Sequence, residues 1–160
     1  MQRSRLAAVA LGPLCAMTMT GTAAAAADSG RSAPVRVDIE PGRGIVVTPD
    51  DYWYIRGTFS FTVSVTDVGE DNDENLFAFV SVPDEIRMVG YEGERWECAA
   101  VEGGVDCSNP DLVVPGEAWP LLTITATGTG YVQDTLDVHA IADSDEWTQT
   151  GTPFVYDTSS

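Results

Sequence analysis

The 160-residue sequence predicts an all-β fold, namely an immunoglobulin-like antiparallel β-sandwich with Greek-key topology and one disulfide. Apolar and polar side chains alternate with a period of two in several segments, as in strands with one buried face. Clusters of Gly, Pro, Asn and Asp separate these segments at short intervals. No window shows the sustained 3.6-residue period of an amphipathic helix. The spacing of the turn signals predicts about seven to nine strands.

The first predicted strands cover residues 35–39 and 58–66. In the second of these segments Ser and Thr alternate with four apolar residues, Phe59, Phe61, Val63 and Val65. Residues 122–127 and 135–142 alternate in the same way near the end of the chain. Residues 76–82 are apolar almost without interruption, which is typical of a central strand covered on both faces. The sequence therefore predicts a single core between two sheets.

Cys98 and Cys107 flank a segment that contains Gly103-Gly104, which is expected to turn a hairpin and bring the two sulfur atoms together. Closing this loop contributes about 2–3 kcal/mol in the chain-entropy model. A redox or zinc site would need closer spacing or additional His and Cys ligands. We therefore expect a structural disulfide between Cys98 and Cys107.

The first 27 residues have the three parts of a secretory signal peptide. Arg3 and Arg5 precede an uncharged apolar stretch, and a run of small residues ends with Ala25 and Ala27 as a cleavage motif. The predicted organisation is a cleaved signal peptide at 1–27, a polar lead-in at 28–33, the sandwich at 34–157 and a tail at 158–160. The mature protein is thus expected to be secreted, extracellular and free of the membrane.

The chain carries 25 acidic and 8 basic residues, for a formal net charge of −17. All the basic residues are arginines, and removing Arg3 and Arg5 with the signal peptide changes the charge to −19. Nucleic acid is excluded as an expected partner, because binding phosphates requires a basic patch. An extracellular protein or a glycan is the expected class of partner.

Several motifs occur together in the second half of the chain. They are Trp96-Glu97-Cys98, Gly103-Gly104-Val105-Asp106-Cys107, Leu112 followed by Pro115-Gly116, and the Thr-rich segment 121–125. In this order they resemble the secreted bacterial Ig-like module known as domain of unknown function 11, over residues 35–156. The resemblance implies a structural or adhesive role, although tandem copies are usual in that family and this chain has one. The segment from Cys98 to Asn109-Pro110 is also similar to a hairpin of the neocarzinostatin-type apoproteins, whose second disulfide this chain lacks.

Two acidic segments are expected at one end of the sandwich, one after the strand at 58–66 and the other after the strand at 135–142. Carboxylates brought together in this way could be bridged by calcium, which takes six to eight oxygen ligands. The spacing is not that of an EF-hand, and two solvated acidic loops that keep the protein soluble remain the alternative. The candidate calcium ligands are Asp67, Glu70, Asp71, Asp73, Asp143 and Asp145.

Tyr52-Trp53-Tyr54 follows two aspartates and precedes the strand at 58–66. If exposed, these aromatic residues could form a platform for a sugar or peptide ligand. These residues could instead pack over one end of the sandwich. Trp96, which lies two residues before Cys98, could pack against the disulfide.

No catalytic residues are predicted. His139 lies on the same strand face as Asp137, but no Gly-x-Ser-x-Gly motif presents a nucleophile. The many acids offer carboxylate pairs of the kind that hydrolyse glycosides, but a sandwich of this size is expected to lack a deep cleft. We expect a non-catalytic structural or interaction module that calcium could stabilise. The alternative is a secreted domain that binds a carbohydrate or a small metabolite.

Overall fold

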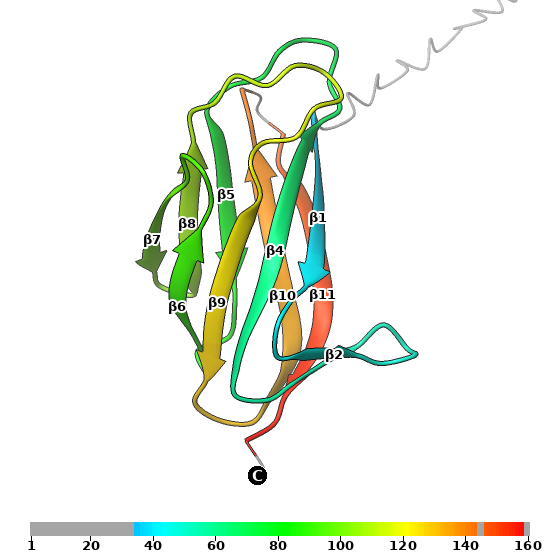
Figure 1. Ribbon diagram of the computed structural model, residues 1–160, viewed down its shortest axis with the longest axis vertical. Coiled ribbons are helices and arrows are strands. Elements are labelled where there is room, and N and C mark those ends of the chain that lie inside the picture. Colours follow the sequence, from blue (N-terminus) through cyan, green and yellow to red (C-terminus); the bar gives the residue numbers. More distant parts are fainter. Residues whose placement is uncertain (1–33, 144–145, 159–160) are drawn as a thin grey trace, which may run out of the picture. The chain divides into compact units, whose positions relative to one another are not determined.

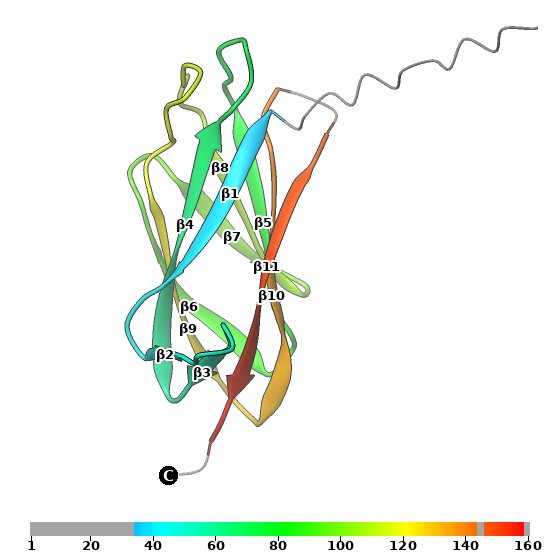
Figure 2. The same ribbon diagram turned by 90° about the vertical axis from the view of Figure 1, so that its right-hand side faces the viewer.

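The computed structural model describes residues 34–143 and 146–158, which form two β-sheets packed face to face (Figure 1, Figure 2). The predicted signal peptide, the predicted lead-in and Asp145 lie outside these residues. Eleven strands are present in the described part of the chain: β1 (Val35–Pro41), β2 (Ile45–Val47), β3 (Trp53–Ile55), β4 (Thr58–Asp67), β5 (Leu76–Ser81), β6 (Ile86–Glu92), β7 (Glu97–Val101), β8 (Gly104–Asn109), β9 (Leu122–Gly128), β10 (Val132–Ile141) and β11 (Thr148–Tyr156). Two strands, β2 and β3, have only three residues each, too few for the alternating pattern to reveal them.

The smaller sheet has the strand order β1-β4-β9-β6, and the larger sheet has the order β2-β3-β11-β10-β5-β8-β7. Neighbouring strands are antiparallel except for β3 and β11, which are parallel. The chain crosses between the sheets from β4 to β5 and again from β8 to β9, so that segments distant in sequence share one core. The predicted antiparallel sandwich is confirmed, but its described part has eleven strands and not seven to nine.

Alternation in the sequence decides which side chains form the core. The apolar residues of β4 and β9 point between the sheets, and none of them is more than 1% exposed. An aromatic cluster joins the layers: the ring centroids of Trp53 and Phe61 are 6.3 Å apart, and those of Phe59 and Tyr156 are 6.2 Å apart. Burying aromatic rings of this size contributes strongly to the stability of the core.

The expectation that residues 76–82 are covered on both faces is wrong. The β5 strand does lie at the centre of the larger sheet, between β10 and β8. Its side chains Leu76, Ala78 and Val80 are at most 2% exposed, whereas Phe77 is 54% exposed. The smaller sheet covers only the inner face; on the outer face Phe79 is half-buried and Phe77 stays exposed. An apolar surface is therefore left open.

The predicted hairpin between the cysteines is formed by β7 and β8. Cys98 and Cys107 lie directly opposite each other and form the expected disulfide. Gly103, with a φ of +78°, supplies the left-handed turn conformation, while Gly104 begins β8 where a Cβ would lie 2.0 Å from the backbone oxygen of Val80. Within the described ranges, no helix is long and apolar enough to cross a membrane.

Candidate functional site

The outer face of the larger sheet carries a groove that crosses β10, β5, β8 and β7. The strand registers arrange its side chains in two rows, since residues directly opposite each other on neighbouring strands share a face. One row runs Ile141, Phe77, Ser108, Glu97, and the other runs His139, Phe79, Asp106, Ala99. Apolar side chains occupy one half of the face, and small or acidic side chains occupy the other half.

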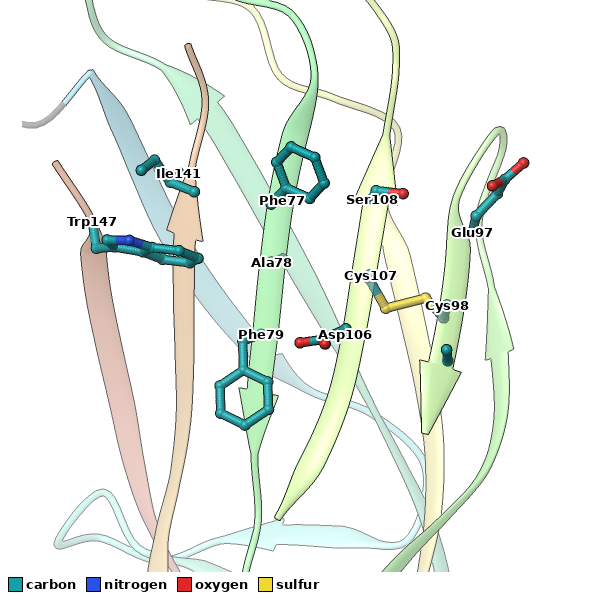
Figure 3. Close-up of a pocket in the computed structure, with 11 residues that line it drawn as sticks. Phe77, Ala78, Phe79, Glu97, Cys98, Asp106, Cys107, Ser108, Ile141 and Trp147 are labelled. Atoms are coloured by element: carbon teal, nitrogen blue, oxygen red, sulfur yellow. A yellow bond between two sulfur atoms is a disulfide. The ribbon is translucent and has the colours of Figure 1, made fainter. Parts of the chain in front are cut away.

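Trp147 completes the apolar half of this groove. It follows β10 in the connection to β11, and its indole extends across β10 toward Phe77 and Phe79 (Figure 3). Trp147 and Phe77 are each 54% exposed, and the groove has a volume of about 630 Å³. We use "apolar groove" for the surface formed by Phe77, Phe79, Ile141, Trp147, Glu97, Ala99, Asp106 and Ser108.

The charge of the apolar groove is negative. Glu97 and Asp106 line it, and no arginine is among the described residues that do so. His139 lies beside it, with its ring centroid 6.1 Å from that of Phe79. The groove can therefore accept apolar groups and attract a positively charged neighbour.

Sequence reasoning missed this surface, although a signal for it was present. Leu76, Ala78 and Val80 alternate with Phe77 and Phe79, so both faces of β5 are apolar. This pattern predicts burial on both faces, but it does not say whether the covering surface belongs to the same chain. The structure shows that the described part of this chain covers the outer face only in part, since Phe77 stays exposed.

The acidic segments do meet at one end of the sandwich, at the top of Figure 1. Asp67 ends β4, Asp73 lies in the β4–β5 loop and Asp143 follows β10. The backbone N–H of Glu74 donates a hydrogen bond to Oδ2 of Asp143 at 3.0 Å, which joins two of these segments directly. We call Asp67, Asp73 and Asp143 the acidic end.

Two carboxylates of the acidic end are buried. Asp67 is 0% exposed and Asp73 is 8% exposed. The Oδ1 atom of Asp67 accepts a hydrogen bond from the N–H of Gly69 at 2.8 Å, but Oδ2 of Asp67 and Oδ2 of Asp73 are buried without a partner. Burial raises the pKa of the Asp73 carboxyl, and the nearby charges of Asp67, Asp143 and Asp71 raise it further.

The remaining candidate ligands differ in position. Glu70 and Asp71 are exposed in the β4–β5 loop, although Asp71 is close enough to affect Asp73. Asp145 lies outside the described residues. Among the residues that are described, no three His, Cys, Asp or Glu side chains are grouped closely enough to hold a metal ion. Any cation here needs backbone or water oxygens as well.

The aromatic segment does not form one exposed platform. Trp53 is only 4% exposed and packs in the core, so it is not available to a ligand. The hydroxyl of Tyr54 donates to Asp157 at 2.5 Å and accepts a hydrogen bond from Arg56 at 2.7 Å. Tyr52 is half-buried, and a role for Tyr52 and Tyr54 in binding stays a prediction.

The other tryptophans also have definite places. Trp119 is buried and donates from Nε1 to the carbonyl oxygen of Asp111 at 3.0 Å. Trp96 is half-buried, and its Nε1 donates to the carbonyl oxygen of Pro120 at 2.6 Å. Both indoles therefore anchor the β8–β9 loop, and Trp147 is the exposed tryptophan of the described chain.

Comparisons with known proteins support the fold. No family model and no curated protein sequence matches this chain. Among solved structures, a cohesin module from a family 33 glycoside hydrolase of Clostridium perfringens ATCC13124 has a TM-score of 0.52 at 9% identity, with 79% of this chain and 100% of that chain covered. The seventh ScaB type I cohesin of Pseudobacteroides cellulosolvens has a TM-score of 0.48 at 8% identity, with 78% of this chain and 94% of that chain covered. At 9% identity, the likeness to the Clostridium perfringens module shows a shared sandwich fold and no more.

Proposed function

We propose that this chain is a secreted, non-catalytic protein-interaction module whose docking surface is the apolar groove. The observation that carries the proposal is the open outer face of β5, where the exposed Phe77 stands in register with Ile141 and lines one groove with Phe79 and the exposed Trp147. Exposing aromatic side chains together is costly, and surfaces of this kind mark interaction sites. The predicted signal peptide and the resemblance to a secreted bacterial module agree with an extracellular role.

The chemistry of the groove favours a polypeptide segment that combines apolar and basic side chains. Phe77 and Trp147 offer surfaces for an aliphatic or aromatic anchor, since such residues dominate binding energy at protein interfaces. Glu97 and Asp106 lie on the other side and offer carboxylates to Arg or Lys. The net charge of −17 would also speed the encounter with a basic partner.

A peptide library tests this function. A displayed library of random peptides is selected on the purified protein, and the dissociation constants of the selected peptides are then measured for the wild type and for a Phe77→Ser, Trp147→Ser variant. We expect the selected peptides to pair apolar residues with Arg or Lys. We also expect the double substitution to weaken binding at least about tenfold, because removing an anchor residue costs about 2 kcal/mol or more.

Tyr131→Ser is the matched control, since Tyr131 is 63% exposed in the β9–β10 connection and does not line the groove. It should leave the affinities unchanged. The proposal fails if selected peptides bind the double variant as tightly as the wild type, or if they show no excess of basic residues. Binding on a glycan array that disappears in the double variant would instead establish the groove as a carbohydrate site.

A further inference from the structure

The acidic end has a rigid framework that comes from three separate parts of the chain. The backbone N–H of Asp67 donates to the carbonyl oxygen of Glu117 at 2.9 Å, and the carbonyl oxygen of Asp67 accepts from the N–H of Gly116 at 2.9 Å. Asp73 and Val113 exchange a pair of backbone hydrogen bonds of 3.0 and 2.8 Å. The β8–β9 loop thus holds both aspartates in place by their backbones, whatever their side chains bind.

One carboxylate oxygen of each aspartate in this framework lacks the partner that a buried charge requires. Oδ2 of Asp67 and Oδ2 of Asp73 are both buried and unpartnered. The ion pairs found between described residues, Arg36–Asp38, Arg56–Asp157 and Arg95–Asp111, involve other carboxylates. A buried carboxylate oxygen without a partner is strongly unfavourable, and two of them at one end of the sandwich repel each other. A group that supplies positive charge would remove both penalties.

The donor set identifies the kind of group that fits. Only oxygen atoms are offered, from Asp67, Asp73 and the exposed carboxylate of Asp143, whose Oδ2 is already fixed by the N–H of Glu74. Neither histidine nor a free thiol is part of the set, which disfavours zinc and copper. Calcium takes carboxylate, backbone carbonyl and water oxygens in flexible geometry, so two or three carboxylates suffice as its anionic ligands.

We propose that the buried carboxylates of Asp67 and Asp73 bind a calcium ion that connects the end of β4 with the β4–β5 loop. Backbone and water oxygens complete its coordination. The ion offsets the repulsion between the buried carboxylates. It also holds the end of β4, in the smaller sheet, to the loop that leads to β5 in the larger sheet. This site is independent of the apolar groove, because the two share no residue.

Thermal melting of the purified protein tests the proposal at constant ionic strength, in 1 mM calcium, in 1 mM magnesium and in EGTA. We expect calcium to raise the melting temperature by about 5–10 °C over EGTA, which is the stabilisation expected when a ligand saturates the folded state alone. Magnesium should have much less effect, because it demands stricter octahedral geometry. Isothermal titration with calcium should give one site per chain.

Asp73→Asn and Asp67→Asn separate a cation site from a cluster that is merely acidic. Each substitution keeps the shape of the side chain and removes one charge, so in EGTA each variant should melt at or above the wild-type temperature. In calcium each should lose most of the wild-type shift. Asp50→Asn removes an exposed charge from the β2–β3 connection and should keep the full shift.

Several outcomes would overturn the calcium site. Superimposable wild-type melts in calcium and EGTA would do so, as would an equal response to magnesium, or a full calcium shift in Asp73→Asn. The melting temperature could instead be independent of calcium and rise as the pH is lowered. That result would show that the buried carboxylates of Asp67 and Asp73 share a proton and do not bind a cation.

Discussion

Removing the disulfide should lower the stability of the sandwich by an amount that the hairpin geometry sets. The perturbation is the double substitution Cys98→Ala, Cys107→Ala, which leaves no unpaired thiol in the hairpin. The two cysteines are separated by 9 positions in sequence. A loop of this length corresponds to about 2.5 kcal/mol of lost chain entropy in the unfolded state.

The structure explains why this loss should reach the whole domain. The β7 strand is the edge of the larger sheet and pairs only with β8, so the disulfide joins an edge to an interior strand. Cys107 is 3% exposed, and its sulfur packs against the core. Because a domain of this size usually unfolds cooperatively, losing the cross-link destabilises all of it.

Urea denaturation followed by tryptophan fluorescence measures the effect. We expect the double variant to lose about 2.5 kcal/mol of unfolding free energy relative to the oxidised wild type, and to melt about 10 °C lower. The wild type with its disulfide reduced should unfold at nearly the same urea concentration as the variant. A loss of unfolding free energy below about 1 kcal/mol would contradict the stabilisation expected from loop closure. An unchanged urea midpoint of the wild type after its disulfide is reduced would contradict it as well.

Two further substitutions test the packing. Gly104→Ala should destabilise the domain by about 2 kcal/mol or more, because its Cβ would lie 2.0 Å from the backbone oxygen of Val80, whereas Gly130→Ala should change the urea midpoint little. Equal effects of the two would contradict the close approach of β8 to β5. Asn109→Ala should lower the free energy of unfolding by about 2–3 kcal/mol in the same assay, because Asn109 is 0% exposed and its side chain is hydrogen-bonded. Its side-chain N–H donates to the carbonyl oxygen of Glu94, and its Oδ1 accepts from the N–H of Asp111. The exposed Asn72→Ala is its control, and losses of equal size would show that the buried amide contributes nothing specific.

The sandwich was predictable because its evidence is local. The alternation in residues 58–66 and 122–127 identifies the strands and their buried faces, and the core has those side chains inside. The hairpin was predictable for a related reason, since two cysteines close in sequence around Gly103 can meet only across a tight turn. The short strands β2 and β3 escaped prediction because three residues are too few to show a period.

The candidate sites were only partly predictable. The meeting of Asp67 with Asp73 and Asp143 followed from the order of strands, but the burial of Asp67 and Asp73 did not, since acidic loops are usually solvated. The sequence left Trp53 open to ligand binding or to packing; Trp53 fills the core, because β3 pairs in parallel with β11 and turns that side chain inward.

The fold class, the disulfide and the strong negative charge could be predicted from the order of the residues, because composition, local periodicity and short loop closures are properties of neighbouring residues. The open apolar surface and the buried carboxylates could be found only in the folded chain. Both depend on long-range packing: the smaller sheet covers only the inner face of β5, and the β8–β9 loop encloses Asp67 and Asp73 through backbone hydrogen bonds to Glu117, Gly116 and Val113.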